Sequence, residues 1–134
     1  MIKNSRGVTL VETVMAIALF AIGITALLGV FTQTVTVAKR ADHAYVAYQL
    51  AKNHVERLKQ LDFASLPTAN ETSTRVNREG TADPVGEFLR STTVTMNYSG
   101  DSNLTQVDVK VFYEVRGVQS PSSMDVTTVI FNGG

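Results

Sequence analysis

The feature that most constrains the fold is a long segment without charge near the amino terminus. From Thr13 to Ala38 no residue is charged, and most are alanine, valine, isoleucine, leucine, phenylalanine or methionine. These roughly 26 residues would form a helix of about 39 Å, whereas the hydrocarbon core of a bilayer is about 30 Å thick. The segment is therefore long enough to span a membrane as one helix.

Charges on both sides of this segment predict its orientation. Lys3 and Arg6 precede it, so the positive-inside rule places the amino terminus in the cytoplasm and the bulk of the chain on the far side. Lys39 and Arg40 follow it and oppose this orientation only weakly, because their side chains can snorkel to the interface. We expect a single-pass membrane protein with a cytoplasmic amino terminus.

A secretory signal peptide is the main alternative for a basic start followed by apolar residues. Its apolar stretch has only about 7–15 residues before a cleavage site with small residues. Here the apolar stretch is about twice as long and continues directly into a helical pattern, which disfavours ordinary signal peptidase as the processing enzyme.

A plain membrane anchor does not explain Glu12. An acid near the centre of a spanning helix costs about 2.5–3.5 kcal/mol on insertion scales, and less near its end. Intramembrane acids usually have a partner, yet no lysine, arginine or histidine lies within the next two turns, and the nearest cation is Arg6. Either Glu12 is hydrated at the headgroup level or its partner comes from outside the segment.

The stretch RGVTLVETVMAIALFAIGI resembles the prepilin signal of type IV pilins and type II secretion pseudopilins. That signal is a short basic leader ending in glycine, an apolar first mature residue, then Thr-Leu-(Ile/Val)-Glu and a long apolar helix. In this chain the matching residues are Gly7, Val8, Thr9, Leu10, Val11 and Glu12, with Val8 where the family usually has phenylalanine.

This resemblance implies a processing route and a set of partners. Prepilin peptidase would cleave after Gly7, which removes a leader of residues 1–7, and would methylate the new amine of Val8. Glu12, with Thr9, Leu10 and Val11 beside it, would dock against other pilin subunits at an inner-membrane assembly platform, by pairing with a neighbour's amino-terminal amine. The resemblance implies a structural protein without a cofactor that ends in a periplasmic or cell-surface filament, with membrane lipid as its surroundings before assembly.

The helical pattern continues beyond the membrane segment. Ala44, Tyr48, Ala51, Val55 and Leu58 recur at steps of three and four residues, which predicts a stripe facing a core. No proline precedes Pro67, so the helix is expected from about Thr9 to about Leu61. We expect residues 8–38 to form its membrane and assembly half, and residues 39–134 to form a periplasmic or extracellular domain that begins with helix 39–62.

The rest of the chain predicts a small sheet. Residues 67–86 are polar and rich in turn formers, which predicts a loop. Three strands are expected over 89–98, 106–115 and 124–131, within a sheet of residues 88–131; Val107, Val109 and Val111 should point inward. The predicted fold class is α+β, with a long amino-terminal helix packed on an antiparallel sheet of three or more strands, as in the pilin fold.

Composition argues against several other functions. Twelve basic and twelve acidic residues are interleaved without a basic stripe, so nucleic-acid binding is not indicated. With no cysteine, a disulfide, a thiol nucleophile and a thiolate metal site are excluded. No catalytic motif stands out, so an enzyme is not expected. His43 and His54 share a helix face, but without acids at ligand spacing they are expected to be solvated rather than to bind metal.

The exact type of subunit stays open. A chain without cysteine lacks the disulfide-bounded loop of many major pilins, and the stretch AYQLAKNHVERLKQL resembles minor pilins and minor pseudopilins, so a minor subunit is favoured. The alternatives are a major pilin, an uncleaved single-pass membrane protein with a small periplasmic binding domain, and a secreted binding domain whose signal is removed.

Overall fold

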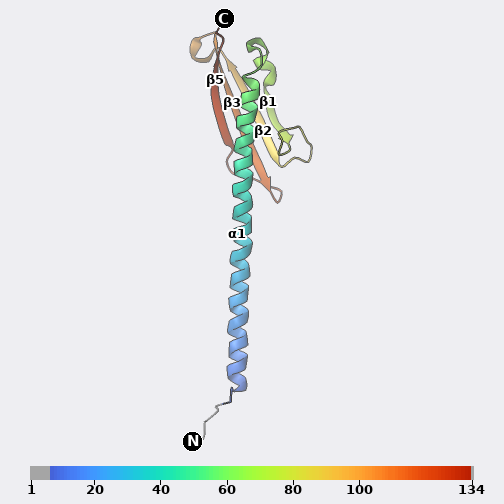
Figure 1. Cartoon of the computed structure of the whole chain (residues 1–134), viewed down its shortest axis with the longest axis vertical. Coiled ribbons are helices and arrows are strands. Elements are labelled where there is room, and N and C mark those ends of the chain that lie inside the picture. The colour runs from blue at the N-terminus through green and yellow to red at the C-terminus, as the bar shows by residue number, and fades with distance from the viewer. Residues whose placement is uncertain (1–6, 134) are drawn as a thin grey trace. The chain divides into compact units, whose positions relative to one another are not determined.

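The computed structural model describes residues 7–133 and divides the chain into two compact units, Met1–Ala38 and Lys39–Gly134. The helix α1, Leu10–Leu58, begins in the first unit and ends in the second (Figure 1). It starts and ends close to the predicted residues, Thr9 and Leu61. The helix ends at Leu58 because the residues that follow form a non-helical turn.

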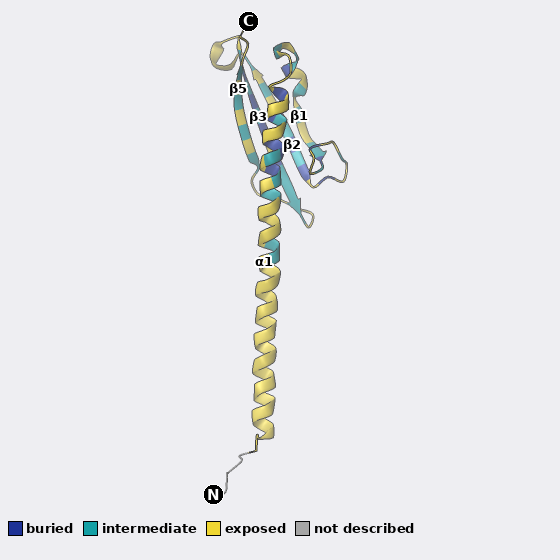
Figure 2. Cartoon of the chain, in the orientation of Figure 1, coloured by how far each residue is buried: buried dark blue, intermediate teal, exposed yellow. Residues whose placement is uncertain are grey.

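The described part of the first unit consists of residues 7–9 and the apolar part of α1. None of its described residues is buried, and α1 is the one helix within residues 7–133 that is long and apolar enough to cross a membrane (Figure 2). Its threonines donate their hydroxyls to backbone carbonyls of the preceding turn, at 2.7 Å for Thr25 and 2.9 Å for Thr34. These bonds pair the hydroxyl groups within the helix itself, as apolar surroundings would require.

The second unit is an antiparallel sheet with the last turns of α1 across one face (Figure 1). Its strands are β1 Glu71–Val76, β2 Phe88–Met96, β3 Leu104–Val115, β4 Val118–Gln119 and β5 Met124–Phe131. They pair in the order β1-β2-β3-β4, and β5 pairs with β3 as well. Two short 3-10 helices, η1 Phe63–Ala69 and η2 Tyr98–Gly100, complete the unit. The predicted α+β class, with a long helix packed on an antiparallel sheet, is confirmed.

The core lies between α1 and the sheet. Ala47, Leu50, Ala51, Val55 and Leu58 of the helix pack against Leu66, Val76, Phe88, Val107, Val109 and Val111. The inward direction of the three β3 valines is confirmed, as is the burial of Ala51, Val55 and Leu58. The prediction for Tyr48 is wrong, because that side chain is 46% exposed. The buried stripe includes Ala47 instead. Tyr48, the next residue, is rotated by about 100° around the helix axis and therefore points away from the core.

The predicted loop over 67–86 is wrong in part, because it contains β1 and the end of η1, up to Ala69. β1 lies at the edge of the sheet, and only Val76 in it is fully buried. Its register with β2 is interrupted between Glu71 and Thr74, where Ser73 has a φ of 48°. A strand with one buried residue and a bulge lacks the alternation of apolar and polar residues by which strands are predicted.

The end of β2 and the turn after β3 also differ from prediction. β2 stops at Met96 rather than at residue 98, because Asn97 and Ser99 have positive φ values of 55° and 58° that turn the chain into η2. Tyr98, the last residue of the predicted strand, therefore lies in η2 and not in β2. The turn after β3 contains the short strand β4, which pairs with Glu114 and Val115.

Candidate functional site

The residues of the predicted cleavage site precede the helix. Gly7, Val8 and Thr9 have no regular secondary structure and are exposed, and the first helical residue is Leu10. The Gly7–Val8 peptide bond therefore lies in an exposed, non-helical segment. A protease that binds its substrate in an extended form requires such a segment. The leader residues Lys3 and Arg6 lie outside the described residues.

Thr9 caps the amino terminus of α1. The backbone N–H of Glu12 donates to the Thr9 side-chain oxygen at 3.2 Å, and the N–H of Thr13 donates to the Thr9 carbonyl at 3.1 Å. Thr9 and Glu12 have the Ser/Thr-x-x-Glu spacing of a capping box, in which the first residue satisfies a free amide of the first helical turn. Sequence reasoning treated Thr9 only as a position of the motif and missed this role, although the spacing is a known signal for a helix start.

Glu12 lies in the first turn of α1, where a carboxylate complements the partial positive charge of the helix terminus. Within residues 7–133, no cation lies within ion-pair distance of Glu12. Its neighbours in the motif are exposed apolar side chains, with Leu10 81% and Val11 68% exposed. The arrangement presents, on an apolar surface, one acid that has no cation partner among the described residues.

The two histidines of α1 are not solvated, so that prediction is wrong. Both lie on the side of the helix that faces the sheet, with side chains 13% and 15% exposed for His43 and His54. His43 stacks on Phe88, with ring centroids 5.7 Å apart, and its Nε2 lies 3.1 Å from Glu87 Oε2. Within the described part of the chain, no three His, Cys, Asp or Glu side chains converge as a metal site would require.

His54 belongs to a buried polar network with Glu71, Arg90 and Thr92. Arg90 donates to both carboxylate oxygens of Glu71, at 2.5 and 3.2 Å, and to the Gly80 carbonyl at 3.1 Å. Burial, followed by the nearby charge of Arg90, lowers the pKa of His54 to about 4, so the imidazole is neutral at pH 7. The network links α1, β1 and β2 and has a structural role.

The carboxylate of Glu71 stays ionised within this network. Its burial opposes ionisation, but the hydrogen bonds from Arg90 and Thr92 and the charge of Arg90 outweigh burial and lower the pKa of Glu71. A second ion pair, in which Arg75 donates to both oxygens of Glu114 at 2.8 and 3.2 Å, joins β1 to β3.

Comparison with known families identifies the amino-terminal segment. Residues 2–28 match the family model of the prokaryotic N-terminal methylation motif. This match supports a type IV pilin-like prepilin. Its long helix on an antiparallel sheet fits the pilin fold. A search of curated proteins and a search of solved structures each found no match.

The motif also bears on how the prepilin is handled. It implies processing by prepilin peptidase and assembly with other pilins, and proteins of this kind are generally structural and non-enzymatic. The exposed apolar part of α1 is compatible with a membrane anchor.

Proposed function

We propose that this prepilin is a structural subunit of a type IV pilus-like filament, held in the inner membrane by residues 8–38 before assembly. Prepilin peptidase cleaves after Gly7, removes residues 1–7 and methylates the amine of Val8. Residues 39–134 lie outside the cytoplasm and become part of a periplasmic or cell-surface filament. The observation that carries the proposal is Glu12, an acid without a cation partner within residues 7–133 at the start of an apolar helix.

Cleavage creates the missing partner for this acid. The new amine of Val8 is cationic at neutral pH, and methylation leaves its charge in place. In its own chain this cation lies next to the helix amino terminus, whose dipole disfavours positive charge. A carboxylate of a neighbouring subunit compensates for that repulsion, and in apolar surroundings each charge is tolerated only when paired. Glu12 is thus a docking residue that makes the correct axial register more stable than others.

We further propose a minor pilin or minor pseudopilin rather than a major pilin. A chain without cysteine has no disulfide-bounded loop near its carboxyl end, and the presence of Glu12 argues against a tip subunit that lacks the acid.

The test of the docking role is incorporation of Glu12→Ala and Glu12→Gln into sheared filaments, with membrane fractions measured in the same cells. Both variants should enter the membrane normally but reach filaments at least tenfold less. The control is Glu79→Gln, which neutralises an exposed acid of the second unit and should assemble as the original chain does. Normal incorporation of both Glu12 variants would refute the docking role.

A further inference from the structure

Cations gather where the chain enters the second unit. Lys39 is the first residue of that unit and is bonded to Ala38, the last residue of the apolar segment. An open cavity of about 370 Å³ beside Lys39 has two more cations in its wall, Arg78 and Arg116. Its full lining is Lys39, Asp42, His43, Arg78, Glu87, Val115 and Arg116.

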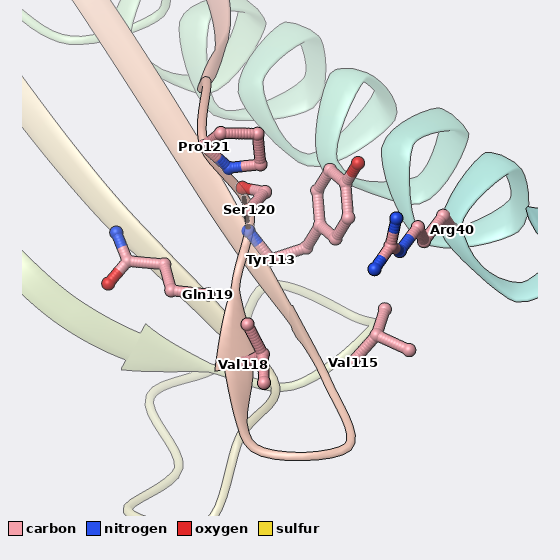
Figure 3. Close-up of a pocket in the computed structure, with 7 residues that line it drawn as sticks. All are labelled: Arg40, Tyr113, Val115, Val118, Gln119, Ser120 and Pro121. Carbon is pink, nitrogen blue, oxygen red and sulfur yellow. Dashed lines mark hydrogen bonds between the residues drawn. The ribbon is translucent and has the colours of Figure 1, made fainter. Parts of the chain in front are cut away.

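A second cavity adjoins the first and adds a fourth cation. It has a volume of about 410 Å³ and shares Val115 with the first cavity. In Figure 3, Arg40 extends from α1 toward Tyr113 and Val115 of β3. The four cations around Val115 are called the basic cluster below: Lys39, Arg40, Arg78 and Arg116.

The basic cluster has a net positive charge although the second unit as a whole does not. Two carboxylates lie in the same cavities: Asp42, which pairs with Arg78, and Glu87, which contacts His43. In formal charges, counted from Lys, Arg, Asp and Glu alone, four cations and two carboxylates leave a charge of +2. Residues 39–134 contain ten Lys and Arg and eleven Asp and Glu, a net charge of −1. The rest of the unit therefore has a charge of −3, so the positive charge of the basic cluster stands out against the unit as a whole.

The tip of the β3–β4 hairpin lies in this cluster and is amphipathic. Arg116 and Gly117 form a two-residue turn with positive φ values of 55° and 74°. The side chain of Val118, the next residue, is 66% exposed. An exposed valine beside an arginine at a hairpin tip suits the headgroup region of a bilayer, where apolar and cationic groups are both accommodated.

We propose that the basic cluster binds the phosphate groups of anionic phospholipids in the leaflet on the far side of the inner membrane, before the subunit enters a filament. The inference rests on the proposed membrane anchoring of residues 8–38. Because Lys39 is bonded to that segment, groups that share a cavity with Lys39 remain near the headgroups at any inclination of the second unit. Arginine guanidinium groups pair with phosphate in a bidentate manner.

The expected strength follows from the net charge. Each basic residue at an anionic membrane surface contributes roughly a fivefold gain in binding, so a net charge of +2 gives roughly a 30-fold preference for an anionic over a neutral bilayer. Such binding would hold the second unit in one orientation against the membrane until assembly separates the subunit from its lipids.

The experiment is hydrogen exchange on the full chain in nanodiscs of phosphatidylcholine, alone or with phosphatidylglycerol. The amides of Arg116 and Gly117 should exchange at least tenfold more slowly with phosphatidylglycerol, and high salt should abolish the difference. The paired substitution Arg78→Gln with Arg116→Gln should also abolish it. The core amides of β3 report folding in each sample.

The control substitution Lys52→Gln with Lys110→Gln removes two cations outside the cluster and should leave the protection intact. Equal exchange in both kinds of nanodisc would overturn the proposal. Protection by glycerol phosphate in neutral discs would identify a free-anion site instead, and protection that follows the number of chains per disc would identify a neighbouring subunit; either outcome overturns it. A chain that enters neither disc contradicts the anchoring itself, whereas entry into both with equal exchange contradicts only lipid binding.

Discussion

The buried ion pair between Glu71 and Arg90 allows a quantitative prediction of stability. Arg90 is 8% exposed, and its guanidinium makes three hydrogen bonds, two to Glu71 and one to the Gly80 carbonyl. Removal of one partner from a buried pair leaves the other charge without compensation, at a cost of about 3–5 kcal/mol. The whole unfolding free energy of a domain this size is about 5–15 kcal/mol. Arg90→Met should therefore lose a large part of the stability.

The double substitution Glu71→Met with Arg90→Met should be less harmful than Arg90→Met alone. Replacement of both charges by apolar side chains of similar volume is often close to neutral, although here the Gly80 carbonyl loses its donor, which costs about 1–3 kcal/mol. The double variant should thus lose about 1–3 kcal/mol.

The assay is urea unfolding of the fragment 39–134, which contains every buried residue of the described chain, followed by circular dichroism. The original fragment must first unfold cooperatively. The reasoning is refuted if Arg90→Met loses less than about 1 kcal/mol, or if the effects of the two single substitutions simply add in the double variant.

Three further predictions concern single residues. The pKa of His54 lies below that of an unfolded histidine, so the free energy of unfolding should fall as pH drops from 6.5 toward 4, by about 1–2 kcal/mol after allowance for solvent screening. His54→Leu should remove this pH dependence in urea titrations at several pH values. Gly86→Ala should cost about 3 kcal/mol or more, since its Cβ would lie 2.2 Å from the Val76 carbonyl oxygen, whereas Gly133→Ala, with only ordinary contacts at 3.8 Å, should be nearly neutral in the same assay. Thr9→Val should remove the helix cap, at about 1 kcal/mol, and speed amide exchange in the first turn of α1 in detergent micelles.

Much of the fold could be predicted from the sequence because its elements follow simple periodicities. The strand β5 has the predicted bounds, and β3 shows an alternation with Val107, Val109 and Val111 inward. The apolar run and the absence of proline before Pro67 predict a single long helix, and α1 extends from Leu10 to Leu58.

The missed features depend on contacts between distant residues. β1 is joined to the sheet by ion pairs with residues far along the chain. Glu71 pairs with Arg90, 19 residues later, and Arg75 pairs with Glu114, 39 residues later, so a local sequence pattern does not predict this strand. The histidines were predicted to be solvated because helix periodicity places them on one face but does not show that the sheet covers it. For His54, the nearby Arg90 becomes apparent only when β2 is placed.

The motif of the candidate site could be predicted from the sequence. Residues Gly7 to Glu12 have the spacing of the prepilin signal and directly precede the apolar segment, and residues 2–28 match the methylation motif. The Thr-x-x-Glu spacing of Thr9 and Glu12 also predicts the helix cap that the structure contains. Partners in a filament lie on other chains, so neither the sequence nor the fold of one chain identifies them.

The most direct test of the central claim is mass spectrometry of the amino-terminal peptide of the native protein, from a host that retains its own prepilin peptidase. We predict a mature chain that starts at Val8, with one added methyl group on its amine. A chain that starts at Met1 would contradict processing as a prepilin and leave an uncleaved membrane protein, and a start beyond Ala38 would indicate a cleaved secretory signal.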